Sequence, residues 1–123
     1  MLAEEYLYSQ IEKATRGDRL HKEERERKIL ERGADRSVRI PAPAVAEPTG
    51  RFSTVSEAMA AFAAARATTV RFVEHCPDDL RALFTSHPLI GPVNCHEMLL
   101  IMAIHPRRHV HQIEENKSAL ARH

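Results

Sequence analysis

The chain has 123 residues, of which 43% are hydrophobic and 28% charged, as expected for one globular domain. Its formal net charge is +1, which gives no reason to expect a nucleic-acid partner or an anionic membrane. No apolar run approaches the roughly 18 residues of a membrane span, and the first residues lack the pattern of a signal peptide. We therefore expect a cytoplasmic protein with no membrane partner. Cys76 and Cys95 are expected as free thiols, although a disulfide between them stays open.

The first third of the chain is rich in helix formers. Residues 2–15 carry apolar side chains near one stripe, which predicts a helix. The alternating charges between Asp18 and Arg36 predict a solvated helix supported by ion pairs four residues apart. Prolines then break residues 37–52 into a loop or extended strap.

A third helix is predicted from a capping box, in which Thr54 precedes Glu57, to about His75. Residues 78–83 are expected to form a short helical turn and residues 87–92 a buried loop. The predicted core face of the helix is Met59, Phe62, Ala63, Val70 and Val73.

Asn94 is a plausible cap for the last helix, predicted over residues 95–117. No alternating pattern is long enough to predict a sheet, so the expected fold class is all-α. We expect a single helical domain over residues 1–117, followed by a C-terminal tail over residues 118–123.

The last helix contains the chain's candidate metal ligands, His105 and His109. At 100° per residue, a stripe that begins at Met98 and Met102 continues through both histidines to Gln112. Two imidazoles four residues apart can bind one metal ion. The alternative is a pair of histidines held by hydrogen bonds in a core or cleft. Pro106 lies between them and predicts a kink, or an end and restart of the helix.

The other chemistry-bearing residues predict no site. His96 lies about 180° from His105 on the helix and therefore cannot share its face. His75 and His87 lie near loops and are not expected as ligands. There is no arrangement typical of a nucleophilic triad and no phosphate-binding glycine loop, so no catalytic residue is predicted.

Two segments together resemble a known family. The loop His87-Pro-Leu-Ile-Gly-Pro92 is followed by a helix ending in Ile104-His105, His109 and Gln112-Ile113. With the proline strap and the Thr54-capped helix, this arrangement resembles the DinB-like proteins, which include YfiT-type and thiol-dependent transferase enzymes. The resemblance covers about residues 1–117.

The resemblance implies an up-down four-helix bundle with a long crossover and a divalent metal, nickel or zinc, held by three histidines. His105 and His109 match two of them. The third histidine, and the family's first helix, would fall before Met1. The resemblance therefore implies three main helices, an incomplete site with low metal occupancy, and a homodimer that completes the bundle.

The expected function is that of a DinB-like, divalent-metal-binding protein related to thiol-dependent transferases or metal-dependent hydrolases. Its small-molecule or thiol substrate is not predicted, and whether it is an enzyme stays open. The alternative is a non-catalytic helical dimer in which the histidines are structural.

Overall fold

The computed structural model describes residues 2–37, 44 and 49–122 of the chain. This part is predominantly helical, as predicted, and also contains a small sheet. Its elements, in chain order, are α1 (Ala3–Glu12), β1 (Thr15–Arg16), α2 (Glu23–Arg32), α3 (Val55–His75), the 3-10 helix η2 (Leu80–Ala82), β2 (Leu83–His87), β3 (Gly91–Asn94) and α4 (Cys95–Ala121).

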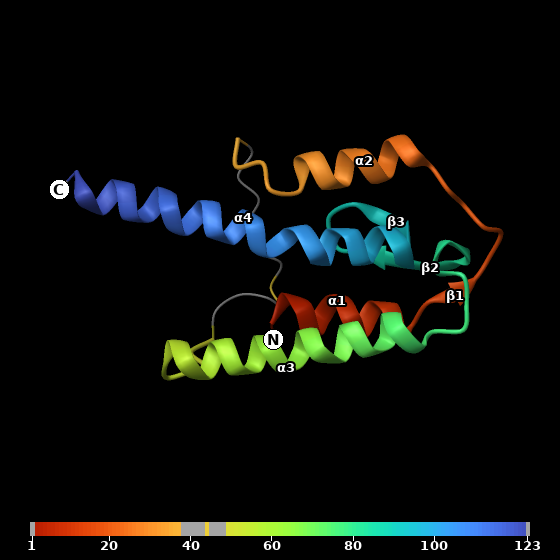
Figure 1. Ribbon diagram of the computed structural model, residues 1–123, viewed down its shortest axis with the longest axis horizontal. Helices are drawn as coiled ribbons and strands as arrows, with labels where there is room; N and C mark the ends of the chain where they lie inside the picture. Colours follow the sequence, from red (N-terminus) through yellow and green to blue (C-terminus); the bar gives the residue numbers. More distant parts are fainter. Residues whose placement is uncertain (1, 38–43, 45–48, 123) are drawn as a thin grey trace.

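The long helix α4 lies in the middle of the molecule (Figure 1). α2 packs on one side of it, while α1 lies on the other side and contacts both α4 and α3. The sheet covers the end at which α4 begins. α1 is short, so it covers neither the N-terminal half of α3 nor the C-terminal half of α4, and both project past it.

The sheet contradicts the prediction that the chain has none. β2 pairs antiparallel with both β1 and β3, with Thr15 opposite Phe84 and Thr85 opposite Val93. The strands have two, five and four residues, so no alternation of polar and apolar residues was long enough to reveal them. Gly91 has φ +85°, a backbone conformation that favours glycine, at the turn that joins β2 to β3.

The core lies where α1, α4 and the sheet meet. Its buried hydrophobic side chains are Leu7, Ile11, Val93, Cys95, Met98 and Met102. Phe72 brings α3 to this core through an edge-to-face contact with Tyr8, with ring centroids 6.0 Å apart.

The predicted core face of α3 is wrong. Met59, Val70 and Val73 are 67%, 44% and 46% exposed, whereas Thr69 is 5% exposed. Buried Glu4 of α1 explains this orientation, because it accepts hydrogen bonds from Arg66 (2.7 Å) and Thr69 (3.0 Å). In an alanine-rich helix apolar periodicity is weak, so these polar contacts determine the face that packs.

The charged second segment is helical, as predicted, but it is not simply solvated. Glu26 of α2 is buried, and α2 packs on α4. A Cβ atom on Gly33 would lie 2.3 Å from Cγ2 of Ile104, so glycine allows this close approach. Most of the predicted strap over residues 37–52 lies outside the described residues.

The predictions at the start of α3 and α4 are confirmed. Thr54 caps α3 by accepting a hydrogen bond from the amide of Glu57, and Asn94 caps α4. Of the two outcomes expected at Pro106, a kink or an end and restart, the second is wrong, because α4 runs through Pro106. The helix continues to Ala121, through residues predicted as tail. Among the described residues, no helix is both long and apolar enough to cross a membrane.

Candidate metal centre

The candidate site is built on α4, whose N-terminus is firmly fixed. The side chain of Asn94 accepts a hydrogen bond from the amide of Glu97 (2.8 Å), and the Glu97 carboxylate accepts one from the amide of Asn94 (2.9 Å). Met98 and Met102 lie on one stripe of the helix and are buried in the core. The same stripe carries His105 and His109 past the end of the core.

Pro106 does not interrupt the helix, because a side chain of α3 replaces the hydrogen-bond donor that proline lacks. Proline has no N–H, so the carbonyl of Met102 loses its ordinary helical donor. The guanidinium of Arg66 donates to that carbonyl at 2.9 Å. Arg66 also forms an ion pair with buried Glu4, which ties α1, α3 and α4 together next to the histidines.

The structure brings the two predicted ligands together. Nε2 of His109 lies 2.8 Å from Nε2 of His105, and the rings meet edge to face with centroids 4.4 Å apart. Nδ1 of His109 lies 3.2 Å from Oε1 of Gln112. An amide oxygen only accepts, so Nδ1 of His109 donates to Gln112, and in the neutral tautomer of His109 Nε2 is then the acceptor. His105 therefore donates its Nε2–H to His109.

Burial, with smaller effects from His109 and Arg108, lowers the pKa of His105 to about 4. The ring is therefore neutral at pH 7, and neutral imidazole is the form that binds metal ions. Metal binding would require His105 to hold its proton on Nδ1, which leaves both Nε2 lone pairs free to face the same ion.

The spacing of the two nitrogens fits a chelate. Metal–nitrogen distances of about 2.0–2.1 Å place two ligands about 2.9 Å apart at a 90° angle and about 3.3 Å apart at a tetrahedral angle. The observed 2.8 Å is close to the first value. A small rotation of exposed His109 would reach the second.

The part of the chain that the structure describes contains no group of three or more His, Cys, Asp or Glu side chains able to hold a metal ion. His87 is buried, and its Nδ1 accepts hydrogen bonds from the amides of Leu89 (3.1 Å) and Ile90 (3.3 Å). This role stabilises the turn after β2. His87 thus has a structural contact within the sheet.

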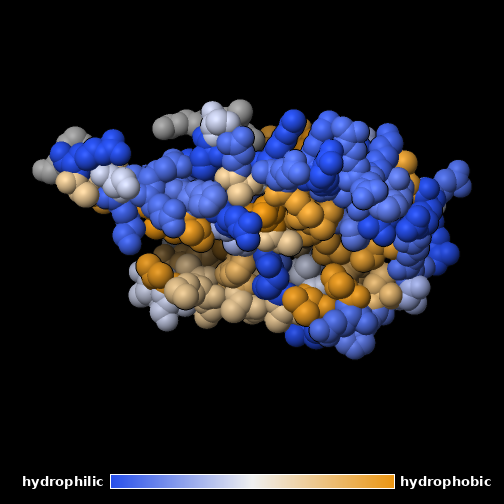
Figure 2. Space-filling model, turned by 45° about the horizontal axis from the view of Figure 1, so that its top comes forward, coloured by the Kyte–Doolittle hydropathy of each residue, from blue (hydrophilic) through white to orange (hydrophobic). Residues whose placement is uncertain are grey.

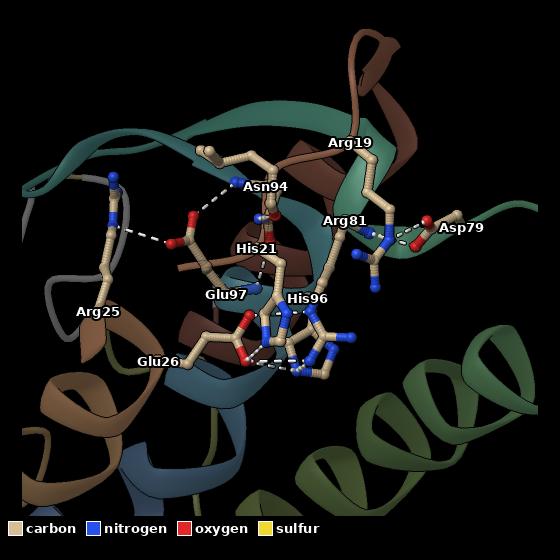
Figure 3. Close-up of polar contacts among 10 residues, drawn as sticks. Arg19, His21, Arg25, Glu26, Asp79, Arg81, Asn94, His96 and Glu97 are labelled. Carbon is tan, nitrogen blue, oxygen red and sulfur yellow. Dashed lines mark hydrogen bonds and ion pairs between the residues drawn. The ribbon is translucent and has the colours of Figure 1, made fainter. Parts of the chain in front are cut away.

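Sequence reasoning missed a second polar cluster, shown in Figure 3, which joins α2 to η2 and α4. Arg81 forms two hydrogen bonds with the carboxylate of Glu26, at 2.9 and 3.0 Å. It also lies 3.0 Å from Nε2 of His96, while Nε2 of His21 lies 3.5 Å from Glu26. Nine of the eleven residues Lys22–Arg32 are charged, and this pattern gave no signal that Glu26 in particular is buried.

The charges in this cluster shift one another's titration. Hydrogen bonding to Arg81 lowers the pKa of Glu26, against a smaller opposing effect of burial. Burial, and then Arg81, lowers the pKa of His96. Beside it, Arg25 of α2 pairs with Glu97 of α4 at 2.9 Å, while Arg81 of η2 pairs with Glu26 of α2. The carboxylates of both ion pairs are buried.

The two cysteines are free, as expected. Cys95 is fully buried, and burial raises the pKa of its thiol to about 11. It is therefore a core residue with little thiolate character at neutral pH.

A separate open groove lies between α2 and the C-terminal half of α4. Charges of both signs line it, among them Glu31, Arg36, Arg107 and Glu114. His111 lies on this side, with Nδ1 3.2 Å from the carbonyl of Ala34, so it faces away from the His105–His109 pair.

Comparison with known proteins identifies no relative from which a role for the site could be transferred. No protein-family model, curated protein or solved structure matches the chain.

Proposed function

We propose that this chain is a DinB-like helical protein that binds a divalent metal ion through His105 and His109. The observation that carries the proposal is the 2.8 Å separation of the two Nε2 atoms, on one face of a single helix. Nickel and zinc are the proposed ions, since both accept imidazole nitrogen.

Three further observations support the proposed ligand role. Gln112 fixes the tautomer of His109, as a hydrogen-bond partner does for metal-ligating histidines. The pKa of His105 is low enough to keep the ring neutral. Arg66 supports the backbone at Met102, one turn before the pair, so the ligands are held on a rigid element.

A metal held by two protein ligands keeps open positions, at which it would polarise a small molecule or bind a thiol. We therefore propose that the chain is related in function to the thiol-dependent transferases and metal-dependent hydrolases. His105 and His109 would bind the ion, and Gln112 would orient His109.

Equilibrium dialysis against zinc and nickel tests the proposal. The chain should retain metal that His109→Ala loses. His75→Ala is the matched control, because His75 is an exposed histidine whose ring contacts the carbonyl of Arg71 in its own helix. Equal retention by His109→Ala and the parent chain would overturn the assignment.

The alternative is a non-catalytic helical dimer whose histidines are structural. It is favoured by large exposed hydrophobic side chains, with Met59, Ile113 and Leu120 at 67%, 57% and 74% exposure. Under this alternative the chain is dimeric in EDTA, and replacing both histidines by glutamine leaves the dimer intact. A monomer in EDTA would exclude it.

A further inference from the structure

The His105–His109 pair offers half of a four-coordinate metal site. Structural zinc sites are almost always tetrahedral with four protein ligands. Within the described residues no third ligand joins the pair. We infer that a second copy of the chain supplies the missing ligands, so that one ion bridges the His105–His109 pairs of two α4 helices; this inference rests on the proposed metal binding.

The position of the pair on the helix makes it accessible to another chain. α1 covers the stripe of α4 that contains Met98 and Met102. The stripe emerges from the core one turn later, where His105 is half-buried and His109 exposed. Figure 1 shows α4 continuing well beyond the start of α1 at this point.

Apolar side chains surround this accessible region. Figure 2 shows hydrophobic surface gathered in a hollow between α3 and the projecting part of α4. The exposed apolar residues on these two stretches include Val55 and Met59 of α3, and Ile113 and Leu120 of α4. Ile113 is one turn beyond His109, so a partner bound at the histidines would also bury apolar surface.

A second copy fits this patch better than an unrelated partner. A twofold interface brings the same patch of two chains together, so two ligand pairs become four around an ion on the axis. The contact closes on itself and forms a dimer. The formal net charge of +1 per chain adds little repulsion between the copies.

The fold restricts how the two copies meet. Because α1 occupies the stripe at Met98 and Met102, the partner's α4 cannot lie along the whole of this face. The two α4 helices must cross near their histidine pairs, which limits the direct contact and makes the metal bridge a large part of the association.

Sedimentation velocity on the full chain, with zinc as the probe, tests the inference. In EDTA we expect monomers, and on titration we expect dimers that reach their maximum near one zinc per two chains. His109→Ala should abolish the zinc-induced dimer, and His75→Ala should leave it unchanged. Ile113→Lys, which places like positive charges near the axis and adds no carboxylate that could bind zinc, should weaken dimerisation about tenfold without preventing zinc uptake.

The outcomes separate this inference from the proposed function. One zinc bound per monomeric chain would overturn the bridge and leave metal binding intact. No zinc uptake would overturn both. A dimer in EDTA that persists in His109→Ala would overturn the bridge in favour of a metal-independent dimer. Circular dichroism of each variant shows whether it has folded, so a lost dimer is read only from folded protein.

Discussion

Arg66 supplies the hydrogen-bond donor that Pro106 removes from the carbonyl of Met102, across 2.9 Å between α3 and α4. The same guanidinium pairs with Glu4, which is buried in α1. A proline inside a helix commonly kinks or breaks it. Here a neighbouring helix satisfies the freed carbonyl, and α4 stays continuous up to and beyond the histidine pair.

Replacing Arg66 by methionine should lower the free energy of unfolding by about 2–4 kcal/mol, because it leaves a buried carboxylate and a carbonyl without their donor. Urea denaturation followed by circular dichroism measures the change. In a Pro106→Ala background the helix N–H at position 106 is restored, so Arg66→Met should cost about 1 kcal/mol less. Equal costs in the two backgrounds would show that Arg66 does not substitute for the missing N–H.

Removing the buried cap of α4 should be more damaging than removing the exposed cap of α3. Asn94 is 1% exposed and also donates to the carbonyl of Leu20, at 3.0 Å. Asn94→Ala should cost about 2 kcal/mol and Thr54→Ala about 1 kcal/mol or less. Thermal unfolding of both variants tests this order, and the reverse order would contradict the role assigned to Asn94.

Gly33 should not tolerate a side chain. A Cβ atom there would approach Cγ2 of Ile104 to 2.3 Å, so Gly33→Ala should destabilise the fold by about 1–3 kcal/mol. The cost should fall in part when Ile104 is also replaced by alanine, which removes the clash with Cγ2 but leaves the backbone oxygen of Ile29 at 2.7 Å. Chemical denaturation of the single and double variants measures the coupling, and a neutral Gly33→Ala would place α2 further from α4.

Acid should weaken the docking of α2. Burial and Arg81 lower the pKa of His96 below its ordinary value of 6.5, so the unfolded chain takes up the proton first as pH falls. The stability that neutral His96 contributes is present above pH 6.5 and is lost as pH falls through the folded pKa. Glu26, whose pKa is lowered from 4.5, loses its contribution at more acidic pH.

The His96 effect is measured by denaturation at pH 7.5 and 5.5. The free energy of unfolding should fall between these values, and His96→Gln should reduce the fall. His87 and His105 also have lowered pKa values and remain in the variant, so the variant isolates the share due to His96. An unchanged fall would show that His96 is not held neutral by the fold.

Local signals predicted the helices well. The Thr54 and Asn94 caps marked the starts of α3 and α4, because a cap is recognisable within a few residues. The same helical spacing placed His105 and His109 on one face, and the structure puts them in contact. Gln112 lies on the same stripe, and its contact with His109 follows from the same periodicity.

Features that depend on distant residues were not predictable in this way. The strands are too short to show alternation, and β2 forms only where β1 and β3 meet it. The buried face of α3 is chosen by Glu4, some 60 residues away in the chain. Glu26 is buried because Arg81 reaches it from η2, and no pattern within the charged segment distinguishes it from its neighbours.

The central claim is that His105 and His109 together bind a divalent metal ion. Long-range proton–nitrogen NMR correlations of the eight histidines, recorded during a zinc titration, test it most directly because they report each imidazole nitrogen. We predict that the Nε2 signals of His105 and His109 shift first and together, and that the proton of His105 moves to Nδ1. Zinc that shifts other histidines while these two signals stay in place would contradict the claim.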